Sequence, residues 1–334
     1  MIGRASAATR ILARHEVAAY LSLDECIAAV EDAFRLHSEG RALGPGVLGL
    51  HAAEGGFHIK AAGLPLARNY FAAKLNANFS GNPARHGLPA IQGVVVLADA
   101  DTGEMLALMD SIEITVLRTG AATAVAARRL ARPESAVLTV VGCGNQGRVQ
   151  VRALARVLPV RTVHAVDQDG DRASAFASEL GAELSIDIRV APSLSDAARA
   201  SDVIVTCTPS RRPMLRAGDV RPGTFIAAVG ADSEDKQELE PALLAHGAVV
   251  TDVLEQCATI GELHHALAAG VMTRADVRGD LGDVVSGRRP GRTSPEEITI
   301  FDSTGSALQD VAAAAVVYER AVASGRGLSV QLGA

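Results

Sequence analysis

Eight residues decide the fold class of this chain: Val140-Val141-Gly142-Cys143-Gly144-Asn145-Gln146-Gly147. They place a G-x-G-x-x-G pattern directly after an apolar strand and at the start of a helix. Gly142 permits a tight turn, Gly144 lets a pyrophosphate approach the backbone, and Gly147 lets helix and strand pack closely. Free N–H groups at the helix start attract negative charge. This context predicts a dinucleotide-binding turn.

An acidic residue follows this turn at a suitable distance. Asp167 ends the next predicted strand, 25 residues after Gly142, near the usual spacing of about 20. A carboxylate there accepts hydrogen bonds from both ribose hydroxyls and repels a 2′-phosphate. Asp167 therefore favours NAD over NADP, and the nearby Arg172 weakens that preference.

Strand and helix patterns alternate through the second half of the chain. Such alternation is typical of a parallel sheet covered on both faces. The fold class predicted is α/β, a Rossmann-type doubly wound parallel sheet. The predicted strands are 136–141, 160–166, 202–207, 224–229, 248–252 and 298–301, with helices at 146–157 and 171–180.

The first half has a different pattern. A helix over 22–38 begins with a capping box at Ser22 and Glu25. Short β-like runs separated by Gly, Pro and Asn then predict a twisted antiparallel sheet over 47–99. An alanine-rich helix over 112–131 is expected to bridge two units, and a helix of small apolar residues over 305–323 is expected to pack tightly. An α+β domain therefore accompanies the Rossmann domain.

Composition excludes several classes of function. The 334 residues carry 32 basic and 38 acidic side chains, a net charge of −6, and only 3% are aromatic with no Trp. This balance argues against binding nucleic acid or an anionic membrane surface. The four cysteines form no C-x-x-C pair, and no apolar run is long enough to span a bilayer. We expect a cytoplasmic protein. The adjacent His264 and His265 lack further ligands at metal spacing, so no metal site is predicted.

Several motifs point to one family. They are L-A-D-A-D-T-G at 97–103, R-T-G-A-A at 118–122, the glycine turn, T-C-T-P-S at 206–210, G-A-D at 230–232, and F-D-S-T-G at 301–305 with Gln309-Asp310. In this order they resemble the ornithine cyclodeaminase and mu-crystallin family, nearly end to end. That family includes NAD-dependent alanine dehydrogenases and ketimine reductases.

The resemblance implies an arrangement of domains. Residues 1–125 and 306–334 would form a substrate-binding and dimerisation domain, and residues 126–305 an NAD-binding Rossmann domain. A homodimer would form through the substrate domains. The partner implied is a small amino or imino acid.

The resemblance also implies roles for individual residues. Lys74 and Arg118 would hold the substrate carboxylate, with Lys74 also catalytic, and Thr304 would contact the substrate. Asp232 matches the acid/base of ornithine cyclodeaminases. The cofactor contacts implied are Arg118, Thr119, Gly142, Gly144, Asn145, Gln146, Gly147, Asp167, Thr208, Val229, Gly230, Lys236 and Ser303.

One departure from the family pattern concerns the carboxylate clamp. The family usually has an arginine after a proline where this chain reads Gly44-Pro45-Gly46, and Gly46 takes its place. Lys60 stands where the family typically has an apolar residue. We hypothesise that Lys60 supplies the missing positive charge as a point charge rather than a planar fork.

Three functions are compatible with these residues. The presence of Asp232 favours cyclodeamination of a 2,ω-diamino acid of the ornithine-to-proline type, with ammonia released and hydride returned from the cofactor. The alternative is an NAD(P)H-dependent amino-acid dehydrogenase or cyclic-imine reductase that shares the same cofactor site. A non-catalytic small-molecule binder resembling mu-crystallin is the third.

Overall fold

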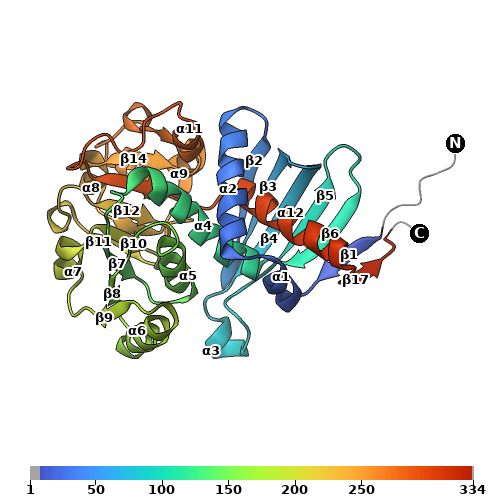
Figure 1. Ribbon diagram of the computed structural model, residues 1–334, viewed down its shortest axis with the longest axis horizontal. Helices are drawn as coiled ribbons and strands as arrows, with labels where there is room; N and C mark the ends of the chain where they lie inside the picture. Colours follow the sequence, from blue (N-terminus) through green and yellow to red (C-terminus); the bar gives the residue numbers. More distant parts are fainter. Residues whose placement is uncertain (1–7, 333–334) are drawn as a thin grey trace. The chain divides into compact units, whose positions relative to one another are not determined.

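The computed structural model describes residues 8–332, which form two compact units (Figure 1). The first unit contains the chain up to Arg118 and again from Ser306 onward, and the second spans Thr119–Gly305. The chain passes from the first unit to the second inside helix α4 (Ile112–Leu130). It returns to the first unit just before helix α12 (Ala307–Ser324). The bridging helix and the tightly packed final helix are thus present close to their predicted ranges.

The described part of the first unit contains a seven-stranded sheet in the order β17-β1-β6-β5-β4-β3-β2. Strands β2 to β6 form the predicted antiparallel sheet, but β1 pairs parallel to β6. No short turn joins β1 to β6, so hairpin geometry does not determine their orientation. The strands are β1 (Thr9–Leu12), β2 (Leu43–Ala52), β3 (Gly55–Pro65), β4 (Asn69–Asn78), β5 (Ile91–Asp99), β6 (Met105–Asp110) and β17 (Leu328–Val330).

Helices cover one face of this sheet. Figure 1 shows α12 lying across β3 to β6 beside α2 (Leu23–Ser38), with α1 (Arg14–Tyr20) near the β6 end. The small side chains of α12, including the run Ala312–Ala315, are buried. Because alanines let a helix approach its neighbours closely, α12 brings its polar residues near the sheet. A short helix, α3 (Asn82–His86), follows β4.

The second unit has the predicted Rossmann-type sheet. Its strand order is β15-β14-β16-β12-β10-β7-β8-β9, and all these pairs are parallel. Every residue of β10, β12 and β16 is buried, as expected for strands covered on both faces. The strands are β7 (Val137–Val141), β8 (Thr162–Val166), β9 (Asp187–Val190), β10 (Val203–Thr206), β12 (Phe225–Ala228), β14 (Ala248–Thr251), β15 (Gly279–Asp280) and β16 (Thr299–Asp302).

Helices and one small sheet surround these strands. The helices are α5 (Asn145–Leu154), α6 (Gly170–Leu184), α7 (Leu194–Ala200), α8 (Pro241–His246), α9 (Leu254–Ile260), α10 (Glu262–Ala268) and α11 (Leu281–Val285). Strands β11 (Arg211–Leu215) and β13 (Gln237–Leu239) pair with each other, and two 3-10 turns lie at Ala217–Asp219 and Arg274–Asp276.

Strand order locates the ligand-binding edge of this sheet. The chain runs from β7 outward to β8 and β9, then returns to β10 on the other side of β7. In open parallel sheets, ligands bind at such a reversal, outside the carboxyl ends of the strands. The glycine turn follows β7 and Thr208 follows β10, so both lie at this reversal.

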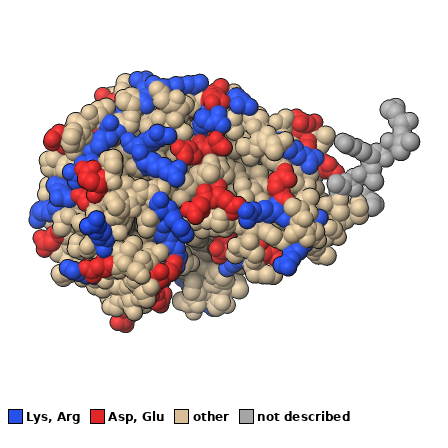
Figure 2. All heavy atoms as spheres, viewed as in Figure 1, with Lys and Arg blue, Asp and Glu red and all other residues tan. Residues whose placement is uncertain are grey.

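Surface charges show no dominant sign on the face drawn in Figure 2, where basic and acidic side chains are interspersed. This distribution agrees with the small net charge of −6. None of the helices in residues 8–332 combines the length and apolarity that crossing a bilayer requires.

Candidate active site

The three glycines of the turn after β7 occupy distinct environments. Gly142 has φ +103°, and a Cβ there would lie 2.9 Å from the Cys207 carbonyl oxygen. A Cβ at Gly147 would overlap the Gly142 carbonyl oxygen, whereas one at Gly144 would have nothing within 4 Å. Helix and turn are therefore in close contact, and the space in front of Gly144 is open. This is the shape that a pyrophosphate needs.

Asp167 supports the same turn from the end of β8. Its Oδ2 accepts the Cys143 N–H at 2.8 Å and its Oδ1 accepts the Asp169 N–H at 3.0 Å. Each carboxylate oxygen retains a further lone pair, which suits hydrogen bonds from ribose hydroxyls. Nη1 of Arg172 lies 3.8 Å from Asp167 Oδ1. The predicted ribose acceptor is therefore placed beside the glycine turn.

The helix start offers further polar groups. Asn145 is exposed, and Oε1 of Gln146 is buried with no hydrogen-bond partner among the described residues. Buried polar atoms usually have partners, so an unpaired oxygen beside this turn fits a site that a ligand completes. A dinucleotide fits the residues present.

Other predicted cofactor residues lie on loops that follow neighbouring strands. Thr208 follows β10, Val229 and Gly230 follow β12, and Ser303 follows β16. The Ser303 N–H donates to the Ala228 carbonyl at 2.9 Å, which joins the loop after β16 to the end of β12. The parallel sheet thus gathers at one edge residues that are far apart in the sequence.

Asp232 and Lys236 pair with each other. Lys236 Nζ lies 2.5 Å from Asp232 Oδ1, and the Asp232 side chain is 44% exposed. His265 Nε2 lies 2.8 Å from the Lys236 carbonyl oxygen. The predicted acid/base is therefore solvent-accessible within this unit and held by a cation four residues later.

Thr304 is held in the interior of the second unit. Its hydroxyl donates to Asp252 at 3.1 Å and accepts from Gln256 Nε2 at 2.7 Å. Asp252 also accepts the Gly305 N–H at 2.7 Å. The Thr304 hydroxyl thus has partners within the unit, and its predicted contact with the substrate stays a prediction.

Buried carboxylates accompany these loops without ion-pair partners in the described structure. Burial raises the pKa of Asp302 to about 7 and that of Asp280 to about 6, and it also raises the pKa of Glu238 and Glu262. Nearby carboxylates add to the effect for Asp302 and Glu262, because like charges disfavour ionisation. None of these acids was singled out from the sequence.

The first unit contains the predicted carboxylate-binding cations in one buried cluster. Lys74 Nζ lies 2.8 Å from Asp310, and Arg118 Nε lies 3.1 Å from the same carboxylate. Arg118 Nη1 also donates to Gln309 Oε1 at 2.8 Å. All are buried, and β4, α4 and α12 supply them. We call Lys60, Lys74, Arg118, Gln309 and Asp310 the cation cluster.

Lys60 joins this cluster through strand register. It lies directly across from Lys74 on β4 and from Val47 on β2, and it is buried. Its charge acts on both Lys74 and Asp310. Gly46 pairs instead with Ala61 and belongs to the neighbouring row of the sheet. Lys60 therefore supplies positive charge to the cluster from a strand position different from that of the missing arginine.

Electrostatics make Lys74 suitable for proton transfer. Burial lowers its pKa to about 7 despite the opposing effect of Asp310, and Arg118 and Lys60 lower it further. Although burial alone would raise the pKa of Asp310, Lys74 and Arg118 hold it below its usual value. A lysine with a pKa near 7 can donate or accept a proton at neutral pH.

Asp310 and Gln309 were not predicted as site residues. They appeared only within the family motif, although an acid and an amide inside an apolar helix are themselves a signal. Gln309 Nε2 is buried with no partner among the described residues. That free donor lies on the side chain that Arg118 contacts.

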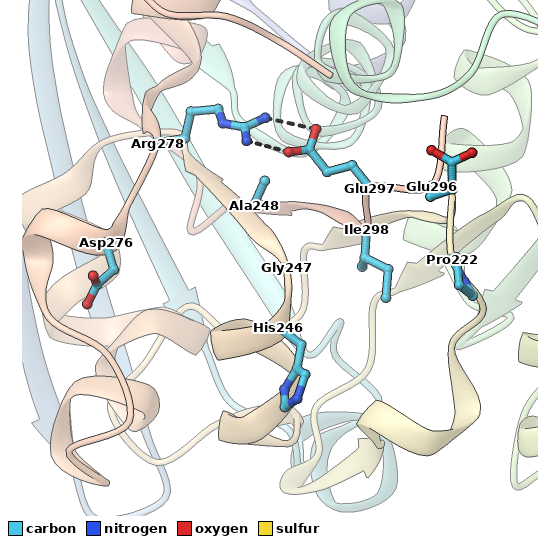
Figure 3. Close-up of a pocket in the computed structure, with 9 residues that line it drawn as sticks. All are labelled: Pro222, His246, Gly247, Ala248, Asp276, Arg278, Glu296, Glu297 and Ile298. Atoms are coloured by element: carbon cyan, nitrogen blue, oxygen red, sulfur yellow. Dashed lines mark hydrogen bonds and ion pairs between the residues drawn. The ribbon is translucent and has the colours of Figure 1, made fainter. Parts of the chain in front are cut away.

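A cavity of about 460 Å³ lies at the opposite edge of the second unit's sheet (Figure 3). It borders the amino ends of β14 and β16. Arg278 within it pairs with Glu297, as the dashed lines show, and despite burial the hydrogen bonds from Arg278 and Thr293 lower the pKa of Glu297 to about 2. Since its paired charges satisfy each other and the glycine turn lies at the other edge, it is not the candidate active site.

Comparisons with known proteins agree with this geometry. The model of the ornithine cyclodeaminase/mu-crystallin family matches residues 7–325. An alanine dehydrogenase of Archaeoglobus fulgidus is 41% identical over 97% of this chain and 98% of its own.

Solved structures are similar over nearly the whole chain. An archaeal alanine dehydrogenase dimer with bound NAD has a TM-score of 0.93 at 41% identity, covering 97% of this chain and 99% of that one. The Δ1-pyrroline-2-carboxylate reductase of Thermococcus litoralis, in complex with NADH and L-proline, has a TM-score of 0.92 at 30% identity, covering 96% and 100%. A lysine cyclodeaminase has a TM-score of 0.83 at 30% identity, covering 97% and 96%.

The raised pKa of Asp302 predicts how stability depends on pH. An unfolded aspartate ionises near pH 3.9, so between about pH 4 and 7 the folded state binds the extra proton. The free energy of unfolding should therefore fall as pH rises through this window, by at most about 1.4 kcal/mol per pH unit for one group. Urea unfolding at pH 5 and pH 7 measures the difference.

Asp302→Asn should make that difference smaller, because the variant lacks the titrating group. The exposed Asp171 provides a control, and Asp171→Asn should leave the difference as in the unmodified protein. An Asp302→Asn protein with the full pH dependence would contradict the assignment.

Proposed function

Since this chain belongs to the ornithine cyclodeaminase/mu-crystallin family, we propose that it is an NAD-dependent oxidoreductase of small 2-amino or 2-imino acids. The observation that carries the proposal is the cation cluster, in which Lys60, Lys74 and Arg118 face the one carboxylate of Asp310. Relatives that are dehydrogenases or reductases support it. The first unit binds substrate, and the second binds NAD through the glycine turn and Asp167.

The cation cluster holds the substrate carboxylate. Lys74 and Arg118 are buried cations that share the single carboxylate of Asp310, so an anionic ligand group beside them is favourable. Arg118 is always charged and offers planar donors, and Gln309 Nε2 adds a donor that has no protein partner. Asp310 hydrogen bonds to both Lys74 and Arg118 and keeps them oriented toward one ligand group.

Lys74 moves the proton on the substrate nitrogen. Oxidation of a 2-amino acid removes a hydride from Cα and a proton from nitrogen, and water then hydrolyses the imino acid to a 2-oxo acid and ammonia. NAD supplies the hydride acceptor when bound. With a pKa of about 7, Lys74 is partly neutral at physiological pH and can take the proton, or return it in the reverse reaction.

Cyclodeamination of a 2,ω-diamino acid is the second candidate. Asp232, a partly exposed acid paired with Lys236, favours it, as does similarity to a lysine cyclodeaminase. In that reaction Asp232 would take a proton from the ω-ammonium before the amine attacks the imine carbon. Similarity to an alanine dehydrogenase, at 41% identity, is higher than similarity to the lysine cyclodeaminase, at 30%, and we therefore rank the oxidoreductase first.

The two candidates differ in stoichiometry. Purified protein with NAD⁺ and a panel containing alanine, aspartate, ornithine and lysine should yield NADH and ammonia in equal amounts. Lys74→Met should lower kcat by about 10² or more through loss of proton transfer, whereas Asp232→Asn should retain most activity. Absorbance at the nicotinamide band and an ammonia assay measure the two products.

Ammonia without NADH, abolished by Asp232→Asn, would replace the proposal with cyclodeamination. Tight NAD binding without turnover of any substrate, in either direction, would indicate a binding protein.

The positive charge of Lys60 should act mainly on substrate binding. Lys60→Met removes one cation from the cluster, and the KM for the amino acid should rise about tenfold with a smaller change in kcat. Arg85→Met is the matched control, because Arg85 is an exposed cation of the same unit that pairs with Glu54. An unchanged KM in Lys60→Met would show that Lys60 does not contact substrate.

A homodimer through the first unit accounts for an uncovered sheet face. Leu48, Leu50, Phe57 and Leu75 are exposed and lie on one face by register, opposite the face that carries Lys60 and Lys74. Contiguous exposed apolar residues on a long edge strand are typical of an interface. We propose that a second copy covers this face, and the similarity to an archaeal alanine dehydrogenase that is a dimer supports the proposal.

Replacing two of these residues, Leu48→Lys with Leu50→Lys, should convert a dimer into monomers because it places charge in an apolar interface. Light scattering after size exclusion measures the mass. Val271→Lys changes an exposed apolar residue of the second unit and should leave the mass unchanged. A monomeric unmodified protein would overturn the proposed dimer.

A further inference from the structure

One buried carboxylate joins two loops at the ligand-binding edge of the second unit. Glu238 on β13 is fully buried, and its Oε1 accepts both the N–H and the hydroxyl of Thr208, at 2.6 and 2.7 Å. Its Oε2 accepts the Gly230 N–H at 2.9 Å. Thr208 follows β10 and Gly230 follows β12, so a single side chain fixes the spacing of both loops.

Two glycines show that the approach of these carboxylates is close. A Cβ at Gly230 would overlap the Glu238 carboxylate, although φ at Gly230 is not positive. A Cβ at Gly261 would lie 2.7 Å from Asp302 Oδ2. Close packing rather than backbone conformation therefore requires glycine at both positions.

Further carboxylates hold Glu238 itself in place. Glu262 accepts the N–H groups of Glu238 and Leu239 at 2.7 and 3.0 Å. Asp302 accepts the N–H groups of Glu262 and Leu263 at 3.2 and 2.9 Å. Each acid thus binds the backbone of the next, in a chain that runs from the end of β16 to the loops after β10 and β12.

Burying this series of carboxylates costs free energy. Hydrogen bonds from backbone N–H groups favour the ionised acids, but burial disfavours them and raises the pKa of Glu238. An apolar residue would pack at position 238 without that penalty, but it could not join Thr208 to Gly230. The arrangement therefore serves the geometry of the loops.

We propose that Glu238 is a positioning residue that sets the loops carrying Thr208 and Gly230 for the nicotinamide half of the cofactor. This inference rests on the proposed NAD-dependent function. In the proposed function the glycine turn and Asp167 hold the adenylate half, and the hydrogen bonds of the Glu238 carboxylate go to Thr208 and Gly230 instead. The role therefore predicts that the two halves of the cofactor respond differently to a change at position 238.

Glu238→Gln is the most direct test. One carboxylate oxygen becomes an NH₂ group that faces an N–H donor, so one loop loses its anchor. The Kd for NAD⁺ should rise at least tenfold and kcat should fall, while the Kd for ADP should change less than twofold. Glu238→Asp keeps the charge on a shorter side chain. Its Kd for NAD⁺ should lie between those of Glu238→Gln and the unmodified protein.

Glu240→Gln is the matched control. Glu240 lies two residues later and accepts the backbone N–H of Ala217, away from the ligand-binding edge. Its substitution should alter neither Kd. If Glu238→Gln weakened the binding of NAD⁺ and ADP equally, the role of Glu238 would be merely structural. If the variant bound NAD⁺ as tightly as the unmodified protein does, the inference would be overturned.

A measurement on the unmodified protein guards against variants that do not fold. Without ligand, the amide hydrogens of Thr208 and Gly230 should exchange slowly with solvent, because the buried carboxylate accepts both. Exchange as fast as in an open loop, measured by NMR, would overturn the inference. If the unmodified protein binds ADP but gives no NAD-dependent reaction, the proposed function fails while the loop anchor can still be judged by exchange.

Discussion

The contact between helix α5 and the turn after β7 is the constraint on which the second unit depends. No side chain fits at Gly147, because the Gly142 carbonyl occupies the space, while nothing fills the space in front of Gly144. The helix start therefore points its free N–H groups at an open position. Other features of the unit place polar groups around this turn. They are the parallel sheet, the reversal of strand order at β7 and the position of Asp167.

The first unit depends on a group of buried charges. Three cations lie in its interior near one carboxylate, and burial alone would make each of them unfavourable. Asp310 hydrogen bonds to two of them, and the small residues of α12 bring it close enough to do so. Lys74 and Arg118 share this one buried carboxylate, which is the physical reason to expect an anionic ligand beside them. Burial, together with the charges of Arg118 and Lys60, lowers the pKa of Lys74 to about 7.

Sequence reasoning found residues that belong to recognisable motifs. The glycine turn, Asp167, Lys74 and Arg118 could all be selected because spacing or resemblance marks them. Glu238, Glu262 and Asp302 could not, because their partners are backbone N–H groups eight or more residues away in the sequence. Such contacts leave no periodic pattern in a single sequence. The parallel pairing of β1 with β6 escaped prediction for the same reason.

The sequence by itself determined the fold class, the family and the cofactor-binding turn, since apolar periodicity and local glycine geometry act over a few residues. Only the tertiary structure decided which charged groups share an environment. Lys60 lies across from Lys74 because two strands pair in one register. Asp310 reaches both Lys74 and Arg118 because a helix from the far end of the chain packs on that sheet. Burial and charge act through space, so these properties depend on packing between segments that are distant in the sequence.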